Sequence, residues 1–134
     1  MKNFANNVVH FNQVVLNIPQ REVGFLNEAE FEISQKCLLE EVNEFVESHK
    51  NGDIIGTIDG LIDMMYFGVG VLYKLGLTVE NIEDIGQHVH DKNMEKKLGV
   101  VAKRGDGSAA DAVKPENWIG PEVGIGEILA SRQL

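Results

Sequence analysis

The sequence of 134 residues contains a single cysteine, Cys37, so no intramolecular disulfide can form. This excludes the disulfide-stapled scaffolds of small secreted proteins. Positive charge is also scarce, since 12 lysines and arginines are outnumbered by 21 acidic residues, which gives a net charge of -9. Such a chain repels phosphate backbones at long range, and no nucleic-acid partner is expected. A small phosphorylated ligand is compatible with this charge where a divalent cation bridges the like charges.

The N-terminal segment "MKNFANNVVHFNQ" has neither a long apolar run nor a small-residue cleavage site, so no signal peptide is expected. The longest apolar run, "IIGTIDGLIDMMYFGVGVLY", has about the length of a membrane span, but Asp59, Asp63 and its glycines argue against one. We therefore expect no membrane contact and a cytoplasmic protein, located in the host cytoplasm if the protein is viral.

No segment shows clean period-two alternation, and an all-α fold is expected. Apolar residues at helical spacing predict four core helices, at about residues 4–18, 27–49, 54–75 and 78–97. Pro19 closes the first helix. Asn27 and Glu30 form a capping-box pattern at the start of the second helix. Thr78 is the expected N-cap of the fourth helix, and Gly99 is expected just past its end.

The segment from residue 99 to the C-terminus is rich in glycine, proline and charge, which is typical of an extended loop over the surface. Pro121 is suited to open a short last helix within this segment. The predicted architecture is a four-helix bundle followed by this C-terminal wrap. It forms a single domain over residues 1–134, with a helical core over about residues 4–98.

Three glutamates of the second helix, Glu40, Glu41 and Glu44, lie at spacings that allow their carboxylates to converge. On their own, these glutamates also fit a solvated acidic face. The same helix carries a predicted core stripe, which consists of Phe31, Leu38, Val42 and Phe45.

Asp59 and Asp63 lie one turn apart in the third helix, which is apolar nearly all round and is therefore expected to be buried. Buried carboxylates without partners are costly, and adjacent ones repel each other. The short "KNGD" turn makes the second and third helices antiparallel neighbours, so their acids can share a divalent cation, Mg²⁺ or its substitute Mn²⁺. A lysine or a capping group is the alternative partner. A carboxylate-bridged iron site is disfavoured, because no Glu-x-x-His pair occurs near the cluster.

The segments "LLEEVNEF", "DGLIDMMYF" and "HDKNMEKK" resemble the MazG-like all-α nucleoside triphosphate pyrophosphohydrolases, a group that includes phosphoribosyl-ATP pyrophosphohydrolase. The pattern of that family is E-E-x-x-E followed by E-x-x-D. Its matching positions are Glu40, Glu41, Glu44 and Asp63. Gly60 stands where the second motif has its glutamate, and Asp59 is expected to take over. The resemblance covers roughly residues 30–121, and the tail "DAVKPENWIGPE" is similar to the tails of small phage members.

The resemblance implies cleavage of a nucleoside triphosphate between its α and β phosphates, which releases a monophosphate and pyrophosphate. Glu40 and Glu41 are the implied catalytic residues, with Glu40 placed to orient or deprotonate the attacking water. The candidate metal ligands are Glu40, Glu41, Glu44, Asp59 and Asp63. Such chemistry requires metal ions that neutralise phosphate oxygens, which agrees with the acidic cluster.

Asn93 and Lys96 share a face of the predicted fourth helix and are candidates for holding the phosphates. Further candidate phosphate-binding residues are Lys92, Lys97 and Lys114. Lysines at a helix C-terminus also simply complement the helix dipole. Weaker candidates for contact with the base are Phe11, Asn12, Gln35 and Trp118, all of which fit ordinary core or surface positions as well.

The leading hypothesis is a metal-dependent (deoxy)nucleoside triphosphate pyrophosphohydrolase that prefers a purine deoxynucleotide such as dGTP. Hydrolysis of phosphoribosyl-ATP is a close alternative. A non-catalytic helical interaction module is the alternative from a different class. The second and third helices carry more apolar surface than four short helices cover, so a homodimer or homotetramer is expected.

Overall fold

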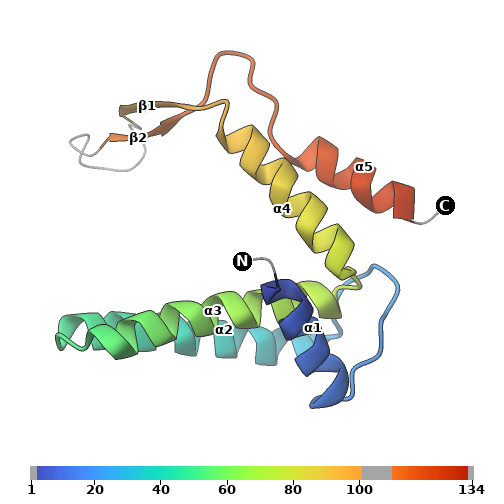
Figure 1. Cartoon of the computed structure of the whole chain (residues 1–134), viewed down its shortest axis with the longest axis vertical. Helices are drawn as coiled ribbons and strands as arrows, with labels where there is room; N and C mark the ends of the chain where they lie inside the picture. The colour runs from blue at the N-terminus through green and yellow to red at the C-terminus, as the bar shows by residue number, and fades with distance from the viewer. Residues whose placement is uncertain (1–2, 101–109, 133–134) are drawn as a thin grey trace. The chain divides into compact units, whose positions relative to one another are not determined.

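The computed structural model describes residues 3–100 and 110–132, and most of this part of the chain is helical (Figure 1). The predicted all-α class is confirmed, with four core helices, a loop with a small strand pair and a short last helix. The elements are α1 (Phe4–Val14), α2 (Glu28–Lys50), α3 (Ile54–Lys74), α4 (Val79–Asn93), β1 (Lys97–Val100), β2 (Ala110–Val113) and α5 (Glu122–Arg132).

The chain forms two compact units, Met1–Ile82 and Glu83–Leu134, and the boundary between them falls within α4. The first unit contains α1, α2 and α3. The second unit contains most of α4, the strand pair and α5. A single domain over residues 1–134 with a helical core to about residue 98 stays a prediction.

Side-chain caps fix where three helices begin. The Asn27 side chain accepts a hydrogen bond of 2.9 Å from the Glu30 backbone N–H, which confirms the predicted start of α2. Asp53 caps the first turn of α3 in the same way. At the start of α4, Thr78 Oγ1 accepts from the Asn81 backbone N–H at 3.1 Å, and Asn81 Oδ1 accepts from the Thr78 backbone N–H at 3.4 Å. The connections therefore lie where local capping chemistry predicts them.

The predicted end of the fourth helix and the predicted absence of strands are wrong. Helix α4 ends at Asn93, and Lys97 begins β1, which pairs with β2 in an antiparallel register that places Lys97 opposite Val113. Gly99 lies inside β1 and does not cap a helix. Each strand has four residues, too few to display alternation, and their pairing depends on a contact between segments separated in sequence.

Small side chains bring α2 and α3 together as close neighbours. One side of α2 carries small residues at Ser34 and Ser48, with Glu41 midway between them at a spacing of seven residues. Ser34 is buried. On α3, a Cβ atom at Gly60 would come within 3.2 Å of the Phe45 backbone nitrogen. This close approach places Glu41, in the middle of the α2 series, against the surface of α3.

The predicted core stripe of α2 is only partly correct. Leu38 and Phe45 are half-buried, but Phe31 is 58% exposed and Val42 is 38% exposed. The side of α2 that meets α3 is rotated toward the small residues, since these allow the closest backbone approach.

Helix α1 packs on α3, and each of the two helices supplies a fully buried side chain. Val8 and Tyr73 are both 0% exposed, and the Tyr73 hydroxyl donates a hydrogen bond of 2.8 Å to the Ile18 carbonyl. Gly76, directly after α3, has a φ of +97°, and a Cβ there would meet the Glu22 carbonyl. These contacts fix the connection between α1 and α2 against the end of α3.

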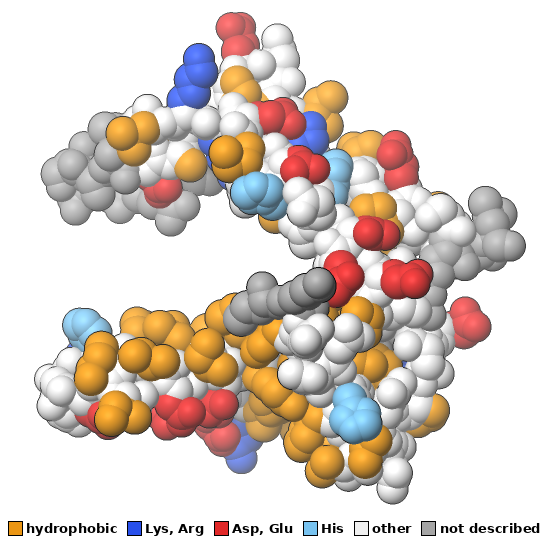
Figure 2. Space-filling model, viewed as in Figure 1, with side chains coloured by type: hydrophobic (Ala, Val, Ile, Leu, Met, Phe, Trp, Pro, Cys, Tyr) orange, Lys and Arg blue, Asp and Glu red, His pale blue; other side chains and the backbone are white. Residues whose placement is uncertain are grey.

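The first unit by itself leaves much of α3 exposed, whereas the sequence predicts burial on most sides. Within the described chain, α3 is long and apolar enough to cross a membrane by length and composition, with a mean hydropathy of 1.5, yet only 17% of that window is buried. Figure 2 shows hydrophobic side chains gathered along the surface of the first unit. A stripe along one side of α3, termed the α3 stripe, consists of the exposed residues Ile54, Ile55, Ile58, Leu61, Ile62 and Met65.

Candidate active site

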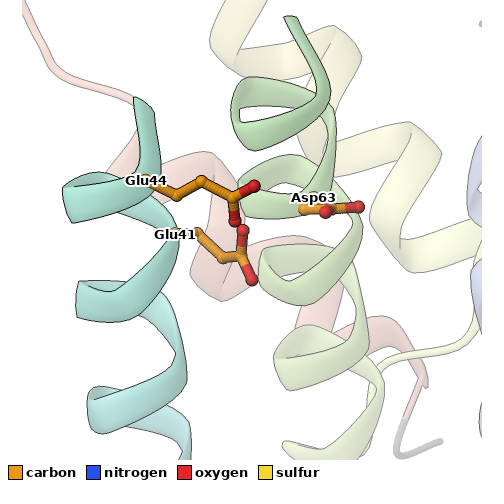
Figure 3. A group of neighbouring side chains, drawn as sticks. All are labelled: Glu41, Glu44 and Asp63. Atoms are coloured by element: carbon orange, nitrogen blue, oxygen red, sulfur yellow. The ribbon is translucent and has the colours of Figure 1, made fainter. Parts of the chain in front are cut away.

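Three carboxylates from two helices converge at one point of the first unit. Glu41 and Glu44 project from α2 toward α3, which supplies Asp63 (Figure 3). One carboxylate oxygen of each residue lies within 4.8 Å of the corresponding oxygens of the other two. This group, termed the acid cluster, confirms that acids of the second and third helices meet.

Burial raises the pKa of Glu41, and the negative charges of Asp63, Glu44 and Asp59 raise it further. Oε2 of Glu41 is buried and has no hydrogen-bond partner in the described residues. A carboxylate oxygen in this position carries a desolvation cost that nothing in the described chain offsets. The cluster therefore favours a positive group, whether a proton or a cation.

The donor set fits a hard divalent cation. Carboxylate oxygens are the ligands that Mg²⁺ and Mn²⁺ prefer, with Mg–O distances of about 2.1 Å and waters or substrate oxygens in the remaining positions. The spacing within the acid cluster is close to what such a cation needs, and the orphaned Glu41 oxygen supplies a ligand atom that is already desolvated. The cluster could therefore hold a metal ion.

The other two predicted acids lie outside the cluster. Asp59 is exposed, and it acts on Glu41 only as the weakest of the named electrostatic causes. Glu40 is also exposed, and with Gln35 it lines a surface hollow on α2. Both residues stay predictions, as a supporting acid and as the water-orienting acid respectively.

The glycine that interrupts the family pattern has a structural reason. Gly60 is buried where α3 comes closest to α2, against the backbone of Phe45. A glutamate side chain at this position would push the two helices apart, because the nearest atoms belong to backbone. The contact at Gly60, one helical turn from Asp63, thus keeps α2 and α3 close enough for the three acids to meet.

Two of the predicted base-binding residues lie together in the first unit. Phe11 makes an edge-to-face contact with Tyr66 at 5.7 Å between ring centroids, and Asn12 is buried. With Gly70 they line a small cavity of about 40 Å³. Tyr66 follows Asp63 by one helical turn, so this cavity lies next to the acid cluster along α3.

The sequence patterns missed three other lining residues of this cavity, Leu16, Phe67 and Lys74. Helical spacing from Asp63 is the signal that would have pointed to Phe67 and Lys74 on α3, whereas Leu16 follows α1. Of the remaining base candidates, Gln35 lies on an exposed face of α2, and Trp118 belongs to the second unit.

The predicted phosphate-binding residues all belong to the second unit. Lys96 lies beyond the end of α4, but its ammonium still donates a hydrogen bond of 3.0 Å to Asn93 Oδ1. Lys92 forms an ion pair of 3.3 Å with Glu95, and Lys97 is exposed on β1. Lys114 and Lys96 both contact the ring of Trp118. The structure thus brings Asn93, Lys96, Lys114 and Trp118 together.

A sequence model of the phosphoribosyl-ATP pyrophosphohydrolase family matches residues 11–93 of this chain. The matched region extends from α1 to the end of α4 and includes all three acids of the cluster. It does not extend to the strand pair or to α5. No curated protein matches the chain significantly.

Proposed function

Because the chain belongs to the phosphoribosyl-ATP pyrophosphohydrolase family, we propose that it is a metal-dependent (deoxy)nucleoside triphosphate pyrophosphohydrolase. Family membership supports a pyrophosphohydrolase activity on a small nucleotide in general. The triphosphate substrate, converted with water into a monophosphate and pyrophosphate, is the finer proposal. The main support for a metal-dependent activity is the convergence of the Glu41, Glu44 and Asp63 carboxylates. One oxygen of this group, Oε2 of Glu41, is buried without a hydrogen-bond partner in the described residues.

In the proposed reaction, the oxygen of water forms a bond to the α phosphorus of the triphosphate. The bond between that phosphorus and the bridging oxygen breaks, and pyrophosphate leaves. One water proton must pass to a base as the bond forms. Glu40, which is exposed on α2, is proposed to orient or deprotonate this water, and Glu41, whose pKa is raised by burial and by the neighbouring acids, is the second proposed catalytic residue.

Glu41, Glu44 and Asp63 are the proposed ligands of Mg²⁺, for which Mn²⁺ substitutes. When bound, the cation neutralises phosphate oxygens and so permits an acidic site to accept a polyanion.

A purine deoxynucleotide such as dGTP is the proposed preferred substrate. The Phe11 and Tyr66 rings and the Asn12 amide beside the acid cluster support contact with a base, for which their cavity of about 40 Å³ would have to widen. Phosphoribosyl-ATP is the second candidate, since the matched family model carries that description. Rates with dGTP and with phosphoribosyl-ATP separate the two.

We also propose that the chain assembles as a homodimer or homotetramer. The α3 stripe is a continuous apolar face that the rest of the first unit leaves exposed. Exposed apolar surface of this extent is unfavourable in water and is typical of an interface. A second copy presents the same stripe, so the contact can be isologous.

The deciding experiment measures pyrophosphate release from the eight common ribo- and deoxynucleoside triphosphates, with and without Mg²⁺. We expect Mg²⁺-dependent release of pyrophosphate and a monophosphate, with the highest rate for a purine deoxynucleotide. The Glu44→Gln protein should lose this activity, and the Glu47→Gln protein, changed on an exposed face of α2, should keep it. Absence of release from every one of these nucleotides and from phosphoribosyl-ATP would favour the non-catalytic interaction module.

A further inference from the structure

Gly60 lies at a close backbone contact between α2 and α3, directly beside the acid cluster. A Cβ atom at this position would come within 3.2 Å of the Phe45 backbone nitrogen and within 3.4 Å of the Phe45 Cα. Phe45 follows Glu44 directly, and Gly60 precedes Asp63 by one helical turn. Because the atoms opposite Gly60 belong to the backbone, a side chain there would displace the helix that carries Glu44.

Other glycines of α3 do not set the separation of the two helices in this way. A Cβ atom at Gly56 would meet the side chains of Asp53 and Ser48, which can rotate away. A Cβ atom at Gly68 would have no described atom within 4 Å. Of these three glycines, Gly60 is therefore the one whose missing side chain determines how closely the backbones of α2 and α3 approach.

The spacing of the three carboxylates lies at a limit that separates small from large divalent cations. Two oxygens bound to one Mg²⁺ lie at most about 4.2 Å apart, which is twice the Mg–O distance, whereas oxygens bound to one Ca²⁺ can lie about 5 Å apart. The oxygens of the acid cluster lie within 4.8 Å of one another. A small change in helix separation thus decides which cation all three carboxylates can reach.

Two of the three acids have little freedom to compensate for a wider separation. Asp63 has a single methylene group, so its carboxylate stays close to α3. Glu41 projects from α2 toward α3, and its Oε2 is already buried (Figure 3). Glu44 is exposed and is the member that can adjust. Helix separation therefore sets the distance between the carboxylates of Glu41 and Asp63.

We propose that Gly60 is a positioning residue that determines cation selectivity, because it holds α2 and α3 close enough for the acid cluster to select Mg²⁺ or Mn²⁺ over Ca²⁺. Gly60 does not contact the cation and acts through the distance of Glu41 and Glu44 from Asp63. A side chain at this position would widen the cluster, which Ca²⁺ tolerates through its longer bonds and flexible coordination geometry. That the cluster holds a cation at all rests on the proposed function.

The test is calorimetric titration of the full chain with Mn²⁺ alone and with Ca²⁺ alone, in the absence of nucleotide. The Asp63→Asn protein reports binding outside the cluster. The parent should bind Mn²⁺ at least about 10-fold more tightly than Ca²⁺. This ratio of affinities should fall at least about 3-fold in Gly60→Ala and about 10-fold in Gly60→Val, because the affinity for the smaller cation is lost first.

Gly68→Ala is the matched control, since it adds the same methyl group to α3 in open space. Its ratio of affinities should equal that of the parent. Asp63→Glu, which lengthens the acid by one methylene group, should restore Mn²⁺ affinity in the Gly60→Ala background and lower it in the parent. A merely structural role for Gly60 would weaken the binding of both cations alike and would not be rescued by the longer acid.

An unchanged ratio in a Gly60→Ala protein that keeps the circular dichroism of the parent would overturn the inference, as would an equal change in Gly68→Ala. Gly60→Ala is the smaller change and keeps the test valid where valine prevents folding. A shifted ratio together with no hydrolysis of any nucleotide would support the role of Gly60 and refute the proposed function. Absence of cation binding by the parent would overturn both.

Discussion

At the scale of single residues, the electrostatic cost of the candidate site is concentrated in Glu41. This carboxylate has one buried oxygen without a partner, and three other acids raise its pKa. Such an arrangement is unfavourable for the empty protein and becomes favourable when a cation is bound. The site is therefore maintained at the expense of stability, as is common where function requires it.

The Glu41→Gln protein should show directly that the site favours activity at the expense of stability. Loss of a ligand charge should lower turnover at least about 100-fold. In EDTA its melting temperature should equal or exceed that of the parent, because the uncharged amide relieves repulsion from Glu44 and Asp63. Differential scanning calorimetry and a pyrophosphate assay measure the two effects.

The control for this change is Glu47→Gln, which removes the same charge from an exposed position of α2. It should alter neither turnover nor melting temperature appreciably. Glu44→Gln and Asp63→Asn should match Glu41→Gln in turnover. Near-normal turnover in all three cluster variants would place the active site elsewhere.

At the scale of elements, α4 is shorter than the sequence predicts, and the turn after it carries Lys96. The hydrogen bond to Asn93 keeps the lysine beside the last residue of the helix, although it is no longer part of the helix. Helical spacing thus predicted that Asn93 and Lys96 lie together, although Lys96 is outside the helix. The ammonium is positioned by this bond and by Trp118.

Lys96→Ala tests whether this turn binds phosphate. If it does, kcat/KM should fall by a similar factor for every accepted nucleotide, on the order of 10- to 1000-fold, because the contact does not involve the base. Thermal stability should change little. The measurement compares kcat/KM on two bases, and a changed ranking with an unchanged overall rate would exclude a phosphate contact.

The connection between α1 and α2 is held by an ion pair whose strength depends on pH. Both guanidinium nitrogens of Arg21 donate to the Glu30 carboxylate, at 3.1 and 2.7 Å. This hydrogen bonding lowers the pKa of Glu30 below its ordinary value. Because the folded pKa is the lower one, the pair stabilises the fold above the unfolded pKa, and this contribution disappears as pH falls through the folded pKa.

The Glu30→Gln protein should therefore melt below the parent at pH 7, by an amount equivalent to about 1 kcal/mol or less for a partly exposed pair. The difference should vanish in acid below the lowered pKa of Glu30. Melting curves across pH for the parent, Glu30→Gln and the exposed-site control Glu32→Gln provide the test. A difference that persists unchanged in acid would show that the ion pair is not its cause.

At the scale of the whole molecule, charge explains why a metal is expected. The chain carries a net charge of -9, and its candidate site is itself acidic. A nucleoside triphosphate approaches such a site only when cations neutralise part of the charge. Substrate binding and metal binding should consequently be coupled.

Activity should vanish in excess EDTA and return on addition of Mg²⁺ or Mn²⁺. The metal should also raise the melting temperature of the parent, since it binds the folded state. That rise should be lost in the Asp63→Asn protein, which lacks one ligand charge. Full activity in EDTA would refute a metal-dependent mechanism.

Self-association is the second prediction for the whole molecule. Light scattering should give the mass of a dimer or tetramer rather than the 14.8 kDa of one chain. Ile58→Asp, in the middle of the α3 stripe, should shift the mass toward that of one chain, because a buried unpaired charge is costly. Glu32→Asp, at an exposed position of α2, is a control that leaves the net charge unchanged. A single-chain mass for the parent at micromolar concentration would contradict the interface.

The sequence by itself determined the helical class, the helix starts and the meeting of Glu41, Glu44 and Asp63. These features depend on local chemistry. Asn27 caps α2 with its own side chain, and helical spacing places the acids on facing sides of two helices joined by a short turn. Interactions within a few residues specify the helical class and the helix starts, whereas the meeting of the acids also requires the short turn that makes α2 and α3 neighbours.

Tertiary structure alone decided what depends on contacts between distant segments. Ser34 and Gly60 set which side of α2 meets α3, and so left Phe31 exposed. The strand pair ended α4 early and brought Lys114 to Lys96 around Trp118. In each case the deciding energy comes from backbone approach or strand pairing between segments far apart in sequence, which no local pattern of residues encodes.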